Sequence, residues 1–350
     1  MLRNYASRFF NASSLLKQFA RARPTVLPPR VQLARPYAQS RLPPGSQRQR
    51  PQYNRFGRAQ GIKYLWQTSS TFRYGLGTAG AGATTFVALN IETVPVSGRK
   101  RFNWVSPKYE QEMGEAQYQQ TMQQFQGAIL PDHHPYSKLV RKVLDRLIPA
   151  SGLENEAWEV HVINAPNEMN AFVVPGGKVF VFSGLLGICE TEEGLATVLG
   201  HEIAHNVAHH AAENYSRISI VLPLAWLASY MFDFSGQLAY MVLDYAYSKP
   251  GSRRQESEAD RIGLMMMAQS CYNPEEAVHL WQRMEKAEKV KIPQFLSTHP
   301  SSHNRIGQIK AWLPEAEQKR ADSECGRTIE YANGFRQAMG IEDESRGSFW

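Results

Sequence analysis

Three residues near the middle of the chain have the types and spacing of a catalytic metal site. His201, Glu202 and His205 form the pattern His-Glu-x-x-His. On a helix, residues four apart share one face, so both imidazoles can reach one ion. Glu202 stands next to the first histidine, where its carboxylate can take a proton from a water molecule that zinc activates. The pattern therefore predicts zinc-assisted hydrolysis.

A third ligand is expected further along the chain. Glu256 and Asp260 are also four apart in a segment with helical periodicity, so they share a face. Two histidines and Glu256 leave the fourth position of zinc open, as a catalytic site requires. Asp260 is expected to accept a hydrogen bond from a ligand imidazole, at the ring nitrogen that does not face the metal. The alternative is a solvated charged face. Glu258 is one residue off this face and is expected at the rim, and His209 is expected at the surface or behind the ligands.

These residues need a buried helix with other elements around it. Residues 191–213 are predicted as the central helix, capped by Thr191, and residues 254–269 as the helix that carries Glu256. Residues 159–163 favour a strand, and residues 171–182 favour a hairpin with a turn of Pro and two Gly. The expected fold class is α+β, mainly helical, with one small sheet before the central helix: a zincin-type metalloprotease domain.

The first 91 residues differ in charge from the rest. They hold 14 Lys and Arg and no Asp or Glu, which leaves 25 basic and 32 acidic residues, a net charge of −7, for the remainder. An Arg-rich, acid-free leader over residues 1–63 is typical of a mitochondrial presequence, with an unstructured basic tail as the alternative. Because the positive excess is confined to the leader, nucleic acid is not an expected partner.

Two apolar stretches suggest contact with a membrane. Residues 74–91 carry no charge, and a helix needs about 20 such residues to cross a bilayer, so we expect a single transmembrane helix there; a flexible Gly/Ala linker is the alternative. If this helix stops in the mitochondrial inner membrane, the chain beyond it faces the intermembrane space. Residues 218–247 are interpreted as an apolar helical hairpin, either buried or membrane-associated. The expected metallopeptidase domain covers residues 92–314, and a charged C-terminal segment covers residues 315–350.

The three cysteines are few and odd in number. Cys189, Cys271 and Cys325 show no Cys-x-x-Cys spacing. Such a set does not predict a disulfide framework, so each is expected to be a small buried or incidental side chain.

Four strings of the chain form a recognisable set: HEIAH, ESEAD, STHPSSHNRI and NAFVVPGGKVFVFSGLL. With them the chain resembles, over roughly residues 92–312, the gluzincin peptidases, which include the CAAX prenyl endopeptidases and the HtpX-type heat-shock proteases. The acid-free leader and the strings VSGRKRF and SRRQESEADRIGL are similar to a mitochondrial inner-membrane branch of that family.

The resemblance implies a set of roles. One zinc ion per chain would be held by His201, His205 and Glu256, with Glu202 as the general base. An extended substrate would add to the edge strand of the hairpin. The residues implied in substrate binding are Asn170, Ala171, Phe172, Val173, Gly176 and Gly177.

Two further residues gain a role only through the resemblance. His299, in the Thr-His-Pro string, would assist catalysis or act as a movable fourth ligand, although the residues alone suggest an ordinary loop. Arg305 would supply a structural or oxyanion-supporting charge.

The role implied for the family is quality control of damaged, misfolded or regulatory proteins of the inner membrane. Protein substrates, the lipid bilayer and further copies of the chain would be its partners. One rival interpretation is a non-catalytic membrane scaffold with a structural zinc site, whose signature would be a fourth Cys or His closing the site, or a missing Glu202. Another is a zinc hydrolase of small substrates, which the hairpin favours less because it suits an extended peptide.

Overall fold

The chain divides into two compact units: residues 1–84 with 220–243, and residues 85–219 with 244–350. The predicted presequence lies mostly in residues 1–56, outside the described residues, and most of the charged C-terminal segment also lies outside them. The computed structural model describes residues 57–232, 236–243, 249–290, 295, 299, 304–323 and 325.

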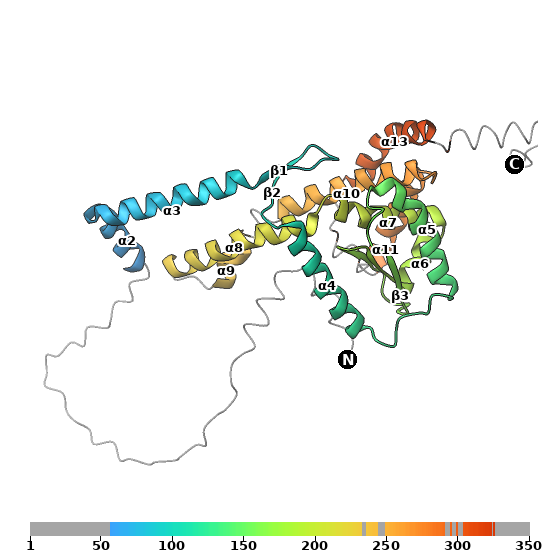
Figure 1. Cartoon of the computed structure of the whole chain (residues 1–350), viewed down its shortest axis with the longest axis horizontal. Helices are drawn as coiled ribbons and strands as arrows, with labels where there is room; N and C mark the ends of the chain where they lie inside the picture. The colour runs from blue at the N-terminus through green and yellow to red at the C-terminus, as the bar shows by residue number, and fades with distance from the viewer. Residues whose placement is uncertain are drawn as a thin grey trace, which may run out of the picture. The chain divides into compact units, whose positions relative to one another are not determined.

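The second unit contains a three-stranded sheet packed between helices (Figure 1). Its strands are β3 (Glu159–Ile163), β4 (Ala171–Val174) and β5 (Lys178–Phe182). The order is β3-β5-β4, with β3 parallel and β4 antiparallel to the central β5. The predicted strand and hairpin are therefore present, and the pairing of β3 with β5 is an addition that local sequence patterns did not indicate.

The two faces of the sheet pack on different helices. Successive side chains of a strand point to opposite faces. Val179 and Val181 of β5 therefore join the main core, while Phe180 and Phe182 join a second cluster with side chains of α4 (Pro107–Gln124). The sheet thus separates α4 from the helices that carry the candidate ligands.

The central helix, α7 (Glu192–Val207), is buried along most of its length. The Thr191 side chain accepts a hydrogen bond from the Gly194 backbone N–H, so this residue caps the helix as expected. Around α7 pack α5 (Pro135–Ser151), α10 (Lys249–Gln269) and α11 (Glu276–Val290). The short α6 (Ser183–Cys189) packs on α7, and α13 (Arg305–Asp322) packs on α10 and α11.

Helices α7 and α10 cross in direct backbone contact. A Cβ placed on Gly263 would lie 2.8 Å from the carbonyl carbon of Gly200 and 2.8 Å from the backbone nitrogen of His201. Carbon atoms at that separation clash, so a side chain at Gly263 would push the two helices apart. The close crossing brings the residues of α10 within reach of the histidines on α7.

The central helix ends earlier than predicted. Instead of one helix over residues 191–213, α7 stops at Val207 and a new helix, α8 (His210–Phe232), begins three residues later. His209 has φ 49°, in the left-handed region, which breaks the helical hydrogen-bond pattern between the two. Periodicity alone did not reveal this break because the apolar pattern continues through it.

A two-stranded hairpin precedes α4. Its strands are β1 (Ile91–Thr93) and β2 (Lys100–Phe102), paired antiparallel. Val94, at the end of β1, is fully buried and joins the main core. Arg101 is also buried and donates hydrogen bonds to Glu92 and to the backbone carbonyl of Ala208.

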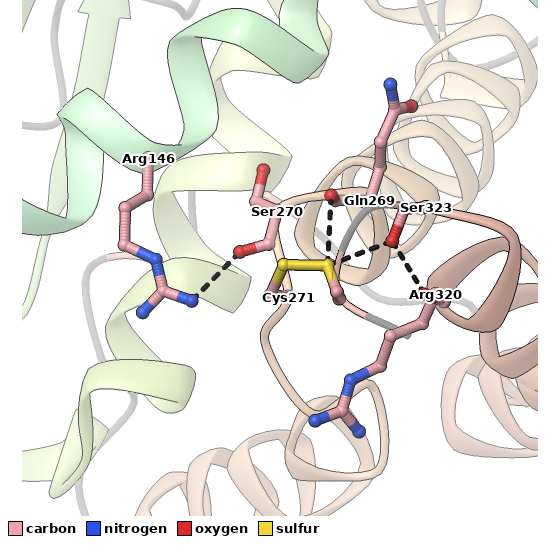
Figure 2. The surroundings of a disulfide bond; sticks show 7 residues. Arg146, Gln269, Ser270, Cys271, Arg320 and Ser323 are labelled. Atoms are coloured by element: carbon pink, nitrogen blue, oxygen red, sulfur yellow. Dashed lines mark hydrogen bonds between the residues drawn. A yellow bond between two sulfur atoms is a disulfide. The ribbon is translucent and has the colours of Figure 1, made fainter. Parts of the chain in front are cut away.

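A disulfide bond joins the segment after α10 to the segment after α13 (Figure 2). Cys271 and Cys325 lie 5.4 Å apart at Cα, within the usual range for a disulfide. The Ser323 hydroxyl lies 2.9 Å from Sγ of Cys325, and Arg146 donates a hydrogen bond to the Ser270 carbonyl on the other side of the bond. The expectation that the cysteines are incidental was wrong for this pair, because spacing along the chain does not show which helix ends meet. Cys189 is buried and unpaired.

The first unit contains α2 (Gly57–Thr68), most of α3 (Ser70–Leu89), residues 220–232 of α8, and α9 (Gly236–Leu243). A small apolar cluster joins α8 to α9. Its members are Val221, Leu222, Ala225, Ala228 and Leu243.

The transmembrane helix predicted over residues 74–91 is not supported. The segment does form a helix, α3, none of whose side chains is buried. Among the described helices, however, none combines the length and the apolar character that crossing a membrane requires. The glycines and hydroxyl side chains of α3 lower its mean hydropathy. A prediction based on the absence of charge does not take this into account. The intermembrane-space orientation depended on this helix and loses its basis.

The disulfide should stabilise the fold mainly by restricting the unfolded chain. It closes a loop with a sequence separation of 54 residues, for which the chain-entropy model gives about 4 kcal/mol. We expect Cys325→Ser, or reduction, to lower the free energy of unfolding by up to that amount, measured by urea denaturation with and without reductant. Cys189→Ser is the control and should keep the dependence on reductant. Equal midpoints for the wild type in both conditions would contradict this account.

Candidate metal centre

Four side chains of the second unit converge on one point. His201 and His205 come from α7, Glu256 from α10, and His299 from the segment before α13. Nε2 of His201 lies 3.1 Å from Nε2 of His205 and 3.4 Å from Oε2 of Glu256. Nδ1 of His299 lies 3.3 Å from Nε2 of His201 and 3.1 Å from Oε1 of Glu256. Within the described part of the chain, this is the one group of His, Cys, Asp and Glu with metal-binding geometry.

The separations suit a tetrahedral ion. Nitrogen and oxygen ligands about 2.0–2.1 Å from zinc at tetrahedral angles lie about 3.3 Å from one another. Imidazoles together with one carboxylate form a donor set that zinc accepts readily. The residues therefore fit a metal ion held by His201, His205 and Glu256, with His299 at the fourth position.

His201 is oriented by a buried carboxylate and a buried guanidinium. Its Nδ1 lies 2.9 Å from Oδ1 of Asp260. Arg305 donates to both oxygens of Asp260, from Nε and Nη2, each at 2.7 Å. The guanidinium also stacks on Trp281, with Cζ 3.5 Å from the ring centroid. Because Nδ1–H donates to Asp260, the lone pair of Nε2 faces the metal position.

The charge balance keeps Asp260 ionised. Burial alone would raise the pKa of Asp260, but Arg305 and the hydrogen bond from His201 outweigh it and hold the pKa below its ordinary value. The structure therefore places Arg305 behind Asp260, where its charge supports the carboxylate that orients His201.

Glu202 lies beside the ligand cluster. It is buried, and its Oε1 has no hydrogen-bond partner among the described residues, although Nε2 of His299 lies 3.4 Å from it as a possible ion-pair partner. Burial raises the pKa of Glu202, while His299 and His201 oppose the change. A buried carboxylate with an unused oxygen next to a metal position can accept a proton from a water molecule there.

His205 is held by residues for which the sequence predicted no role at the metal site. Its Nδ1 lies 2.8 Å from Nδ1 of His210, and Nε2 of His210 lies 2.9 Å from Oε2 of Glu258. Arg99 of the hairpin donates from Nε to the same carboxylate at 2.8 Å, and Ser97 donates to it as well. The adjacent pair of histidines after the His-Glu-x-x-His pattern is the signal in the sequence that could have found this arrangement.

The prediction that Glu258 lies at the rim was wrong. Only 8% of the residue is exposed. Glu258 does point away from Glu256 and Asp260, but the hairpin and the start of α8 cover that side of α10. Burial would raise the pKa of Glu258, but hydrogen bonds from His210, Arg99 and Ser97 outweigh it and lower the pKa to about 2.

His209 takes no part in the cluster. Its Nδ1 lies 2.7 Å from Oε2 of Glu110 on α4, and its side chain is nearly half exposed. The hydrogen bond to Glu110 raises the pKa of His209, although partial burial opposes the change.

The segment that carries His299 is anchored to the sheet. The backbone N–H of Phe295 donates to the carbonyl of Met169, just before β4, and the N–H of His299 donates to the carbonyl of Phe295. The Phe295 ring stacks on the His299 imidazole, with centroids 4.7 Å apart. The position of His299 is therefore set by backbone bonds as well as by its neighbours in the cluster.

The residues implied in substrate binding lie on β4 and the turn after it. Strand β4 packs against α7 and pairs with β5 along one edge, and no described strand pairs with its other edge. Asn170 is buried, and its Oδ1 has no partner in the described residues. Ala171 and Val173 face the main core, Phe172 packs on Phe180 on the other face, and Gly176 and Gly177 form the turn with positive φ.

The contact of His209 with Glu110 predicts a pH-dependent contribution to stability. Because the pKa of His209 is raised in the folded chain, the stabilisation is complete below the unfolded value of about 6.5 and is lost as the pH rises through the folded value. Glu110→Gln should therefore lower the free energy of unfolding more at about pH 5.5 than at about pH 8.5, as measured by urea denaturation.

Glu112→Gln, an exposed position on the same helix, is the control and should show no such difference. An equal effect of Glu110→Gln at both pH values would contradict the proposed contribution of His209.

Comparison with known proteins agrees with this geometry. The family model described as Peptidase family M48 matches residues 137–313. The protein named Mitochondrial metalloendopeptidase OMA1 from Schizosaccharomyces pombe is 45% identical over 256 residues, which cover 73% of this chain and 76% of that protein. Its namesake from Saccharomyces cerevisiae is 37% identical over 306 residues, covering 81% and 88%.

A human relative is more distant. The protein named Metalloendopeptidase OMA1, mitochondrial, is 31% identical over 270 residues, which cover 72% of this chain and 51% of that protein. These matches confirm the metallopeptidase resemblance and include every residue of the candidate centre from His201 to Arg305 within the family model. The chain belongs to peptidase family M48.

Proposed function

We propose that this chain is a zinc-dependent endopeptidase of mitochondria. The observation that carries the proposal is the convergence of His201, His205 and Glu256 beside the buried carboxylate of Glu202, whose Oε1 has no hydrogen-bond partner among the described residues. Membership of a peptidase family and relatives named as mitochondrial metalloendopeptidases support both the reaction and the location.

The residues divide the work of peptide hydrolysis. His201, His205 and Glu256 would hold zinc, which polarises a water molecule and the scissile carbonyl group when bound. Glu202 takes a proton from the water at its unused carboxylate oxygen and returns it to the leaving amine. Asp260 and Arg305 keep the His201 ring in the orientation that binding requires.

His299 has to leave its position before hydrolysis. A catalytic zinc ion keeps one position for water. Nδ1 of His299 lies 3.3 Å from Nε2 of His201 and 3.1 Å from Oε1 of Glu256, so it would compete with water for that position. Rotation of the His299 side chain would open the position and leave an imidazole nearby to assist the reaction.

The same position of His299 favours a second candidate function, a non-catalytic protein with a structural metal. His299→Ala separates the two. In an endopeptidase, His299→Ala still binds zinc about as tightly. Its activity is kept or increased, or it is lost because the assisting imidazole is missing. A structural site loses zinc and thermal stability together and shows no cleavage in either form.

The substrate is proposed to be an extended polypeptide. It would add to the edge of β4 that no described strand occupies and lie next to α7. Asn170, Ala171, Phe172 and Val173 would run along it, with the turn of Gly176 and Gly177 at its end. The backbone groups along this edge suit any sequence in extended form, which fits a protease that acts on damaged, misfolded or regulatory proteins.

The inner membrane is the proposed location. In the first unit, α8 and α9 expose apolar and aromatic side chains, an arrangement typical of contact with lipid or protein. The exposed side chains are Leu224, Trp226, Leu227, Tyr230, Leu238, Met241 and Val242.

A homo-oligomer is proposed from the family resemblance alone.

Glu202→Gln should abolish cleavage and leave the metal in place. Loss of the proton acceptor is expected to lower the rate by at least about 10²–10⁴-fold, while His201, His205 and Glu256 are untouched. Cleavage of casein and zinc content are measured on the same full-length preparation. Glu193→Gln, near the start of the same helix, is the control. A near-normal rate in Glu202→Gln would end the assignment.

Glu256→Gln should weaken metal binding. An amide is a neutral and poorer ligand than a carboxylate, so we expect a loss of zinc affinity of at least about 10–100-fold, measured by competition with a chelator. Glu285→Gln, at an exposed position on α11, is the control. Unchanged affinity would mean that a different carboxylate holds the metal.

A further inference from the structure

We propose that Arg99, on the hairpin of β1 and β2, is a positioning residue for His205, which it reaches through Glu258 and His210. The inference rests on the metal site proposed above. It assigns the hairpin a role in metal binding although none of its residues lies among the ligands.

His205, His210, Glu258 and Arg99 form a chain of hydrogen bonds, called the path below. Which atom donates at each step follows from the ligand role of His205. Nε2 of His205 faces the other ligand atoms, 3.1 Å from Nε2 of His201, so its lone pair must be available and Nδ1 must carry the hydrogen. That N–H donates to Nδ1 of His210, which therefore carries its own hydrogen on Nε2 and donates it to Glu258. With this one placement of hydrogens, each ring nitrogen of His210 and Nδ1 of His205 has a hydrogen-bond partner, and the last acceptor is the Glu258 carboxylate.

Arg99 holds that carboxylate in place. Its Nε donates to Oε2 of Glu258 at 2.8 Å, and its Nη1 and Nη2 donate to the two oxygens of Glu213 at 3.0 and 2.6 Å. Arg217 also donates to Glu213. Two buried carboxylates and two guanidinium groups therefore balance one another, and Arg99 is the group that joins the pair on α8 to Glu258 on α10.

Without Arg99, the path loses its fixed end. Glu258 would keep Ser97 as a donor but would lose the guanidinium that holds its carboxylate where it accepts from Nε2 of His210. The His210 ring then has no single preferred orientation, and the Nδ1–H of His205 loses a fixed acceptor. A ligand imidazole that is not held in one tautomer and orientation binds metal less tightly.

The two histidine ligands on α7 are thus oriented by similar means from opposite sides. His201 donates directly to Asp260, to which Arg305 of α13 donates. His205 is connected to the Glu258 carboxylate through the imidazole of His210, and Arg99 of the hairpin donates to that carboxylate. In both cases the arginine belongs to a segment far from the ligands in sequence.

A reciprocal effect on the hairpin follows. If docking of the hairpin increases zinc affinity, zinc must favour docking by the same factor. The hairpin is short, and the side chains of β1 are exposed, so the hairpin is held mainly through Val94, Ser97, Arg99 and Arg101. Its backbone should therefore exchange hydrogen more slowly in the presence of zinc.

The test compares zinc affinities of full-length variants by chelator competition. Arg99→Met and His210→Phe should each lower the affinity by about 10–100-fold. The double variant should lose no more than the larger single loss, because both changes interrupt one path. Lys100→Met, an exposed cation on the same hairpin, is the matched control and should bind as the wild type does. Hydrogen exchange of residues 91–102 with and without zinc should show protection by zinc in the wild type and not in Arg99→Met.

The outcomes separate this inference from the proposed function. A wild-type chain that binds no zinc overturns both. If the wild type binds zinc, unchanged affinity in Arg99→Met, or a double variant whose loss is the product of the single losses, overturns the inference alone. Should Arg99→Met fail to fold, Glu258→Gln interrupts the same path with little change of shape. Wild-type affinity in that variant overturns the inference, and a loss similar to that of His210→Phe supports it.

Discussion

The close crossing of α7 and α10 is the constraint on which the candidate centre depends. Gly200 and Gly263 let the two backbones touch, and each neighbours the residues that matter: His201 follows Gly200, and Asp260 lies one turn before Gly263. Glu256 reaches the histidines because the helices are this close. A larger side chain at either glycine would separate two ligands from the third without altering any of them.

The sequence predicted the part of the centre that depends on helical periodicity. The His-Glu-x-x-His pattern and the four-residue spacing of Glu256 and Asp260 each place two side chains on one face, and the structure brings those faces together. His299 could be identified only from the family resemblance, because nothing local distinguishes it from a loop residue. Arg99, His210 and Glu258 were missed since their roles depend on how a distant hairpin covers the other side of α10.

The fold shows the same limit. Turn residues and β-prone runs predicted β3, β4 and β5, but the parallel pairing of β3 with β5 joins segments that are separated in sequence. The pairing of Cys271 with Cys325 likewise depends on where α10 and α13 end in space. Residues 74–91 gave a helix without the apolar character of a membrane span, because glycine and threonine are uncharged without being strongly hydrophobic. Local patterns thus predicted elements, whereas pairings between distant segments required the tertiary structure.

The break between α7 and α8 decides which of two adjacent histidines meets His205. On an unbroken helix, His209 would be the neighbour four residues on, and His210 would point about 140° away from His205, at 3.6 residues per turn. The left-handed conformation of His209 turns the chain so that this residue faces Glu110 and His210 reaches His205 instead. If the motif were transferred to a straight designed helix, the ligands would be kept, but His209 instead of His210 would lie next to His205. The irregular residue belongs to the minimal transferable unit as much as the ligands do.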